Sequence, residues 1–264
     1  MQEYLEFAIG IARYAGTIMK QYFYEDEKGV EYKSDRTPVT VADVLINEYL
    51  IEKVKETYPS FGVDGEEVKY NLGKEYMWVC DPIDGTSQFT RKVPVSMFSL
   101  ALVRDGEVIL GVTYDPFLDE MYTAIKGEGA YCNGKKIHVN KKKMGELECS
   151  IDYCMWDQAK YDTLEIVKEI RGDVKTCQVG STVHASMLVA RGLISAEIFP
   201  GVNHGHCDIA ASKLIVEEAG GKVTDFHGKE QRYDQDIDGA ILSNGCVHDS
   251  LIDIIEELEM KSKI

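Results

Sequence analysis

The chain has 264 residues, 44% of them hydrophobic and 28% charged, a composition typical of a globular protein with one large domain or two subdomains that share a core. Its 29 basic and 45 acidic residues give a net charge of −16, which argues against a nucleic-acid partner because the phosphate backbone would be repelled. No apolar run reaches the length needed to cross a bilayer, so no membrane partner is expected.

The seven cysteines show no Cys-x-x-Cys spacing, and the N-terminal segment places Glu3 and Glu6 among its apolar residues, unlike a secretory leader. An odd number of cysteines without such a leader favours reduced thiols. The expected location is therefore the cytoplasm, with most cysteines acting as small core residues.

Residues 1–145 are predicted to form an N-terminal α+β subdomain that carries an acidic, metal-binding loop. Apolar positions at helical spacing predict helices over 3–24 and 41–56. The predicted strands are 61–64, 76–80, 98–104, 108–114, 120–125, 129–132 and 137–140. Asp105-Gly106 and Asn133-Gly134 are hairpin turn signals, so consecutive strands are expected to pair in an antiparallel sheet.

Residues 146–264 are predicted to form a C-terminal α/β subdomain that completes the active site, because strands and helices alternate there. The predicted strands are 149–153, 174–179, 194–199, 240–243 and one that opens at residue 222. The predicted helices are 159–171, 182–191, 208–219 and 247–260.

Two aspartates three residues apart follow the apolar run Met77–Cys80, in the sequence Asp81-Pro82-Ile83-Asp84-Gly85-Thr86. Strand ends are where α/β folds place their chemistry. Two close carboxylates repel each other unless a cation or a proton lies between them. Because hard divalent cations prefer oxygen ligands, this loop predicts a Mg²⁺ or Mn²⁺ site. Gly85-Thr86-Ser87 is expected to open a helix whose free N–H groups bind phosphate.

Further acidic residues lie at positions that would suit the same site. Gly65-Glu66-Glu67 follows a predicted strand, and Asp43 and Asp208 each lie near a helix start. Each also has a structural interpretation, as a solvated turn charge for Glu66 and Glu67 and as a helix-start residue for the two aspartates. A single metal site would use all of them together, which favours the functional interpretation.

These residues resemble a known family. The segment Trp78–Thr86 corresponds to the pattern Leu-x-x-Asp-Pro-Ile-Asp-Gly-Thr, with Trp78 at the Leu position. The similarity runs from Thr40–Asp43 through Gly65–Glu67 to Val216–Gly221. The chain resembles the inositol monophosphatase family, part of the Mg²⁺-dependent, Li⁺-sensitive phosphatase superfamily. The resemblance implies an α+β fold, a five-layer αβαβα sandwich with an antiparallel sheet in the N-terminal half and a mixed α/β C-terminal half. It also implies a homodimer.

The resemblance further implies a role for each site residue. The metal ligands would be Glu66, Asp81, the Ile83 carbonyl, Asp84 and Asp208, which would hold two or three Mg²⁺ ions, or alternatively Mn²⁺. The catalytic residues that position and deprotonate the attacking water would be Asp43, Thr86 and Glu66. The substrate contacts would be Gly85, Thr86, Ser87, Gly180, Ser181 and Thr182. Lys33–Arg36 would lie on a loop that closes the site.

Three departures from the family pattern bear on the substrate. Cys207 stands where Trp is usual, Gly201 where inositol-specific members have Glu, and Gln88 where Asn is common. Loss of a carboxylate that contacts substrate hydroxyls would weaken discrimination among sugars. His204 and His206 are expected to serve in loop packing or substrate contact, since Mg²⁺ sites favour oxygen ligands.

The expected function is Mg²⁺-dependent hydrolysis of inositol monophosphate or a related small polyol or sugar phosphate. Alternatives in the same class are 3′(2′),5′-bisphosphate nucleotidase and fructose-1,6-bisphosphatase activity. An alternative from another class is a catalytically silent scaffold that binds phosphorylated ligands. The intact acidic set argues against the scaffold, because paired carboxylates are unfavourable where no chemistry needs them.

Overall fold

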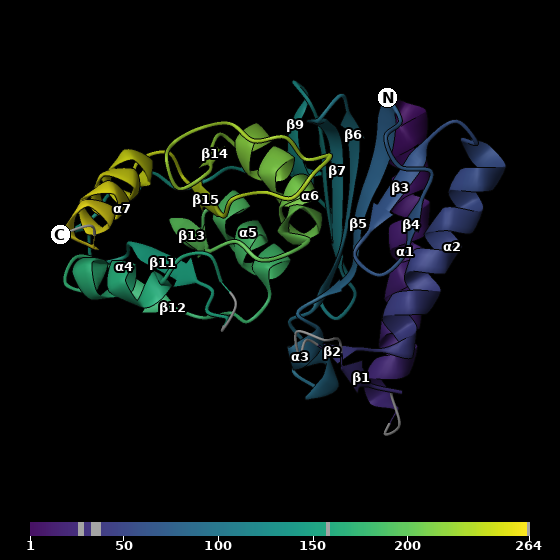
Figure 1. Ribbon diagram of the computed structural model, residues 1–264, viewed down its shortest axis with the longest axis horizontal. Coiled ribbons are helices and arrows are strands. Elements are labelled where there is room, and N and C mark those ends of the chain that lie inside the picture. The colour runs from purple at the N-terminus through teal and green to yellow at the C-terminus, as the bar shows by residue number, and fades with distance from the viewer. Residues whose placement is uncertain (26–28, 33–37, 157–158, 263–264) are drawn as a thin grey trace.

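The chain stacks in five alternating layers of helix and sheet (Figure 1). The computed structural model describes residues 1–25, 29–32, 38–156 and 159–262. The helical layers are formed by α1 (Gln2–Tyr24) with α2 (Val41–Thr57), α5 (Thr182–Ala190) with α6 (Gly205–Glu218), and α4 (Thr163–Ile170) with α7 (His248–Ser262). An eight-stranded and a five-stranded sheet separate them. This arrangement confirms the predicted α+β fold and its five-layer αβαβα order.

The eight-stranded sheet is antiparallel except where β3 runs parallel to β5. Its strands in spatial order are β10 (Lys135–Lys136), β9 (Gly129–Cys132), β8 (Glu120–Ile125), β7 (Glu107–Asp115), β6 (Met97–Arg104), β5 (Tyr76–Asp84), β3 (Gly62–Gly65) and β4 (Lys69–Tyr70). A separate two-stranded sheet joins β1 (Glu31–Tyr32) to β2 (Pro38–Val39). The Asp105-Gly106 and Asn133-Gly134 turns join neighbouring strands, as their sequences predicted.

The five-stranded sheet is mixed. Its strands in spatial order are β12 (Lys175–Cys177), β11 (Ser150–Tyr153), β13 (Ala196–Phe199), β15 (Ala240–Ser243) and β14 (Lys222–Thr224). The first three run parallel to one another, and β15 is antiparallel to both of its neighbours. Parallel strands must be covered on both faces, which α5 on one side and α4 with α7 on the other provide.

Apolar side chains fill the space between layers in three clusters. One holds α1 and α2 against the outer face of the eight-stranded sheet around Trp78 and Leu50. A second joins α5 and α6 to the facing sides of both sheets, and a third packs α4 and α7 on the five-stranded sheet. Because α6 contacts β5, β6 and β7, the C-terminal half packs directly on the N-terminal sheet. The division of the chain into subdomains at residues 145 and 146 stays a prediction.

Several element boundaries differ from the predicted ones. The strand predicted to end at Cys80 continues to Asp84, because backbone pairing with β6 resumes after a bulge between Asp81 and Asp84. The strand predicted over 137–140 is wrong; the short β10 takes its place as the partner of β9. The helix predicted from 208 begins at Gly205. No helix in the described ranges is long and apolar enough to cross a membrane.

Candidate active site

The carboxylates of Asp81 and Asp84 lie at the end of β5, an interior strand of the eight-stranded sheet. Both residues are buried, and the bulge between them turns the backbone so that Asp81 Oδ1 accepts the N–H of Ile83 at 2.9 Å. Gly85 follows with a φ of +78°, a left-handed conformation that favours glycine. The local sequence therefore fixes how the two carboxylates leave the strand.

Asp208 joins this pair from α6. One carboxylate oxygen from each of Asp81, Asp84 and Asp208 lies within 4.8 Å of the other two. Burial raises the pKa of Asp81 well above its ordinary value, and the neighbouring charges of Glu66, Asp208 and Asp84 raise it further. Three converging carboxylates of this kind form a donor set that suits a hard divalent cation.

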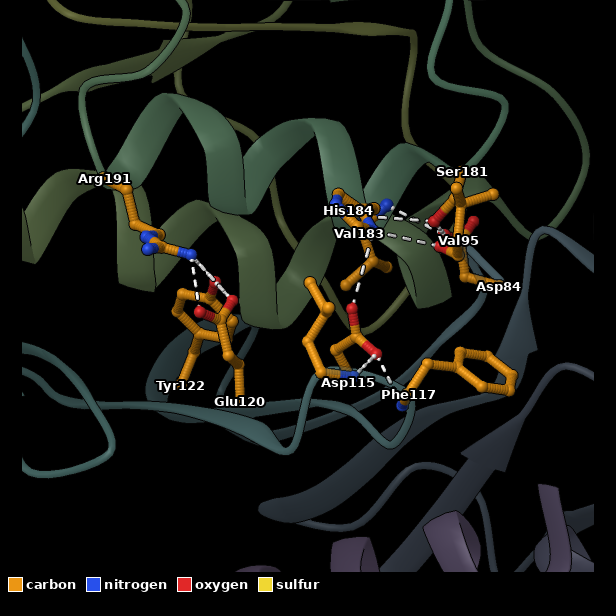
Figure 2. A network of polar contacts seen from close by, with 11 residues as sticks. Asp84, Val95, Asp115, Phe117, Glu120, Tyr122, Ser181, Val183, His184 and Arg191 are labelled. Atoms are coloured by element: carbon orange, nitrogen blue, oxygen red, sulfur yellow. Dashed lines mark hydrogen bonds and ion pairs between the residues drawn. The ribbon is translucent and has the colours of Figure 1, made fainter. Parts of the chain in front are cut away.

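The first turn of α5 holds Asp84 in place (Figure 2). The Ser181 hydroxyl donates to Asp84 Oδ2, which also accepts the Val183 N–H at 3.0 Å, and Oδ1 accepts the Thr182 N–H at 3.2 Å. Burial raises the pKa of Asp84 to about 6, and these three hydrogen bonds oppose the rise. The family resemblance implied substrate contact for Ser181 and Thr182, and no local sequence pattern indicated this support of Asp84.

Glu66 enters from the neighbouring strand. It follows β3, which runs parallel to β5, and its N–H donates to the Cys80 carbonyl at 3.0 Å. Its charge contributes to the raised pKa values of Asp81, Asp84 and Asp43. Glu66 therefore lies within electrostatic range of the three aspartates.

Asp43 occupies the first turn of α2 and is fully buried. Its Oδ2 accepts the N–H of Thr40 at 2.8 Å and the Thr40 hydroxyl at 2.5 Å, so it caps the helix start. Its Oδ1 is buried with no hydrogen-bond partner. Burial raises the pKa of Asp43 to about 7, and the charges of Glu66 and Glu67 add to the rise. One oxygen of Asp43 therefore caps the helix, while the other has no hydrogen-bond partner.

The predicted phosphate-contacting residues come from two segments that lie side by side. Thr86 begins the five-residue helix α3 (Thr86–Thr90), and its hydroxyl donates to the Ile83 carbonyl at 2.8 Å. A Cβ added at Gly85 would lie 3.2 Å from the Gly180 carbonyl and 3.1 Å from Ser181 Cβ. The structure therefore brings residues 85–87 next to residues 180–182, whereas residues 33–36 lie outside the described ranges.

His204 and His206, which the sequence singled out, and a third histidine, His184, all lie near the site. His206 is buried, with Nε2 at 3.0 Å from Asp64 Oδ2, an aspartate that the sequence did not single out. His184 Nδ1 lies 3.2 Å from the Val95 carbonyl (Figure 2). His204 adopts a left-handed φ of +61° directly before α6. No alternating pattern in the sequence marks Asp64, because β3 is buried at every position.

The Cys207 thiol lies beside Asp208 but is not set up to react. It is buried, and burial raises its pKa well above the ordinary value for a thiol, with the nearby Asp64, Glu66 and Asp208 charges adding to the rise. A reactive cysteine needs the opposite environment, one that stabilises the thiolate.

Comparison with known proteins gives one consistent result. The model of the inositol monophosphatase family matches residues 1–260. The inositol monophosphatase of Dictyostelium discoideum is 32% identical over 237 residues, covering 86% of each chain. The fructose-1,6-bisphosphatase/inositol-1-monophosphatase of Thermotoga maritima is 29% identical over 258 residues, covering 96% of each. A solved IMPase structure from Thermotoga maritima is similar with a TM-score of 0.87 at 30% identity, covering 98% of this chain and 99% of that one.

Proposed function

The chain belongs to the inositol monophosphatase family, whose members are phosphoric monoester hydrolases, and from this premise we propose that it hydrolyses inositol monophosphate or a related small polyol or sugar phosphate with Mg²⁺ as its cofactor. The observation that carries the proposal is the meeting of the Asp81, Asp84 and Asp208 carboxylates, which come from two different layers of the fold.

The residues present fit a divalent cation. The proposed ligands, all of them oxygen donors, are Glu66, Asp81, the Ile83 carbonyl, Asp84 and Asp208. Buried carboxylates that raise one another's pKa values are unfavourable without a positive partner. Asp43 belongs to the same group, because its Oδ1 has no hydrogen-bond partner and the Glu66 charge raises its pKa. Bound divalent cations at such a site lower the pKa of an attacking water and stabilise the phosphoryl oxygens.

The chain's own residues would handle the proton and the substrate. Asp43, with a pKa of about 7, can accept a proton near neutral pH and acts as the general base in this proposal. Thr86 orients the water together with Asp43. The adjacent backbone segments at Gly85–Ser87 and Gly180–Thr182 bind the phosphate. The Asp84 carboxylate stays aligned because three donors of α5 fix both of its oxygens.

The substrate class rests on similarity rather than on a contact. A Thermotoga maritima relative carries both fructose-1,6-bisphosphatase and inositol-1-monophosphatase in its name, so activity on fructose 1,6-bisphosphate is the second candidate. Gly201 supports it, because a site without a carboxylate at that position discriminates less strongly among sugar hydroxyls. Nucleotide bisphosphates and silent phospholigand binding stay as alternatives. A homodimer, a cytoplasmic location and inhibition by Li⁺ stay predictions.

Phosphate release from inositol 1-phosphate, fructose 1,6-bisphosphate and 3′-phosphoadenosine 5′-phosphate tests the proposal. We expect turnover with Mg²⁺ and none in EDTA. Asp84→Asn should lower the rate by more than about 100-fold, which exceeds the typical effect of replacing a residue that only supports a metal ligand. Asp249→Asn, on the exposed face of α7, is the matched control and keeps full activity. Equal rates in EDTA and Mg²⁺, or binding of all three esters without turnover, would refute it.

A further inference from the structure

A second buried cluster of metal-binding groups lies in the other sheet. Asp152 on β11 stands directly opposite Glu197 on β13 in the parallel register. Cys154 follows Asp152 by two residues, directly after the end of β11 (Ser150–Tyr153). One ligand atom from each of the three, two carboxylate oxygens and the thiol sulfur, lies within 4.8 Å of the others.

The cluster is largely buried. Asp152 is 1%, Glu197 0% and Cys154 9% exposed. Asp152 Oδ1 accepts the Val179 N–H at 2.7 Å, and Glu197 Oε2 accepts the Ser186 hydroxyl at 2.6 Å. These contacts come from neutral donors, so they leave the negative charge of each carboxylate without compensation.

Among the described residues, no positively charged side chain is paired with Asp152 or Glu197. Within the described ranges, no lysine, arginine or histidine forms an ion pair with Asp152 or Glu197, and the charges that act on Glu197 are those of other acids. Glu197 Oε1 is buried with no hydrogen-bond partner at all. Like charges directly opposite each other on neighbouring strands destabilise a sheet, and buried charges in proteins are normally paired or bound to a metal.

We propose that Asp152, Cys154 and Glu197 bind a divalent cation of the Zn²⁺ type, at a site separate from the Asp81–Asp84–Asp208 site. The two carboxylates and the Cys154 thiolate would carry three negative charges, of which the ion would offset two. A sulfur donor beside two oxygens favours Zn²⁺ over Mg²⁺. Coordination of the sulfur releases the thiol proton to solvent. The ion would supply the partner that Glu197 Oε1 lacks.

The site has a structural role through α5. The Ser186 hydroxyl donates to Glu197, and Thr182 Oγ1 lies 3.7 Å from the Cys154 sulfur. One turn earlier, Ser181 donates to Asp84 of the first site. The two acidic clusters therefore both contact the N-terminal half of α5.

Cobalt substitution tests the sulfur ligand on the full-length protein. The protein is stripped with EDTA and titrated with Co²⁺, which gives a near-ultraviolet charge-transfer band only when a thiolate binds it. We expect the band in the wild type and in Cys207→Ser, whose thiol lies beside the first site, and its loss in Cys154→Ser. A wild type without the band, or a Cys154→Ser variant that keeps it, would overturn the proposal.

Zinc content provides a second readout that is independent of phosphatase activity. Elemental analysis after dialysis against Zn²⁺ is expected to find one ion fewer per chain in Glu197→Gln than in the wild type. Asp84→Asn should retain the sulfur-bound ion. If Glu197→Gln fails to fold by circular dichroism, Asp152→Asn takes its place. Unchanged zinc content in a folded variant would mean that protons, and not a metal ion, neutralise the two acids. The proposed site would then be rejected.

Discussion

The N–H of Val183 donates to Asp84 Oδ2 at 3.0 Å, joining residues 99 positions apart in the sequence (Figure 2). Asp84 ends a strand of the eight-stranded sheet, whereas Val183 lies in the first turn of a helix from the other half of the chain. An acidic residue at a helix N-terminus interacts favourably with the helix dipole. The position of this carboxylate therefore depends on the packing of both halves.

Ser181→Ala should weaken both the helix and the site. The Ser181 hydroxyl accepts the His184 N–H at 3.1 Å as the N-cap of α5 and donates to Asp84. Loss of the cap is expected to lower the free energy of unfolding by about 1 kcal/mol, and loss of the Asp84 contact to weaken Mg²⁺ affinity about 10- to 100-fold. Urea unfolding and calorimetric Mg²⁺ titration measure the two effects.

Asp162→Ala is the control for Ser181→Ala. Asp162 caps α4 through the Leu164 N–H at 2.9 Å and lies in an outer layer. It should lose a similar amount of stability and keep its Mg²⁺ affinity. If both variants lose affinity equally, the link between α5 and Asp84 is not the cause.

The metal-free protein should become less stable as pH rises between about 4 and 7. Burial raises the pKa of Asp84 from 3.8 to about 6 and that of Asp43 from 3.8 to about 7. The folded state thus binds more protons than the unfolded state in this window. The stability that these groups contribute is complete below pH 3.8 and is lost as pH rises through their folded-state pKa values.

Urea melts in EDTA at several pH values measure this slope, up to about 1.4 kcal/mol per pH unit for each group. Asp84→Asn should flatten the part of the slope between about pH 4 and pH 6. Saturating Mg²⁺ should reverse the trend, because it binds the ionised carboxylates. Metal-free stability that instead rises with pH across the window would contradict the assignment.

Gly111→Ala should displace α6 and with it Asp208. A Cβ at Gly111 would lie 2.8 Å from the Ala211 carbonyl, on the turn after Asp208. Backbone cannot move aside as a side-chain end can, so we expect a loss of about 1–3 kcal/mol in stability and weaker Mg²⁺ binding. Gly10→Ala, on α1 with nothing within 4 Å, should stabilise by up to about 1 kcal/mol. Equal melting curves for the two variants would contradict this prediction.

Arg191→Ala should lower the free energy of unfolding by more than the removal of an exposed ion pair does. Arg191 Nη1 lies 2.8 and 2.6 Å from the two carboxylate oxygens of Glu120 and 3.1 Å from the Tyr122 hydroxyl (Figure 2). This contact ties the end of α5 to β8, and its loss leaves a half-buried charge, so we expect about 1–3 kcal/mol of destabilisation by urea unfolding. Lys126→Ala, which breaks the exposed pair with Glu107, should change stability by less than about 1 kcal/mol.

The sequence by itself determined the features that depend on near neighbours. Apolar spacing predicted α1 and α2, and Asp105-Gly106 predicted a hairpin, because helices and tight turns form from contacts within a few residues. The spacing of Asp81 and Asp84 indicated paired carboxylates for the same reason. The resemblance then supplied Asp208 and the five-layer order.

Only the tertiary structure decided which distant residues meet. The support of Asp84 by Ser181 depends on how α5 packs against the first sheet, and no local pattern records that contact. The pairing of Asp152 with Glu197 depends on the order of strands in the second sheet, because parallel partners are separated by a whole crossover. Contacts of this range follow from the packing of complete layers rather than from the chemistry of adjacent residues.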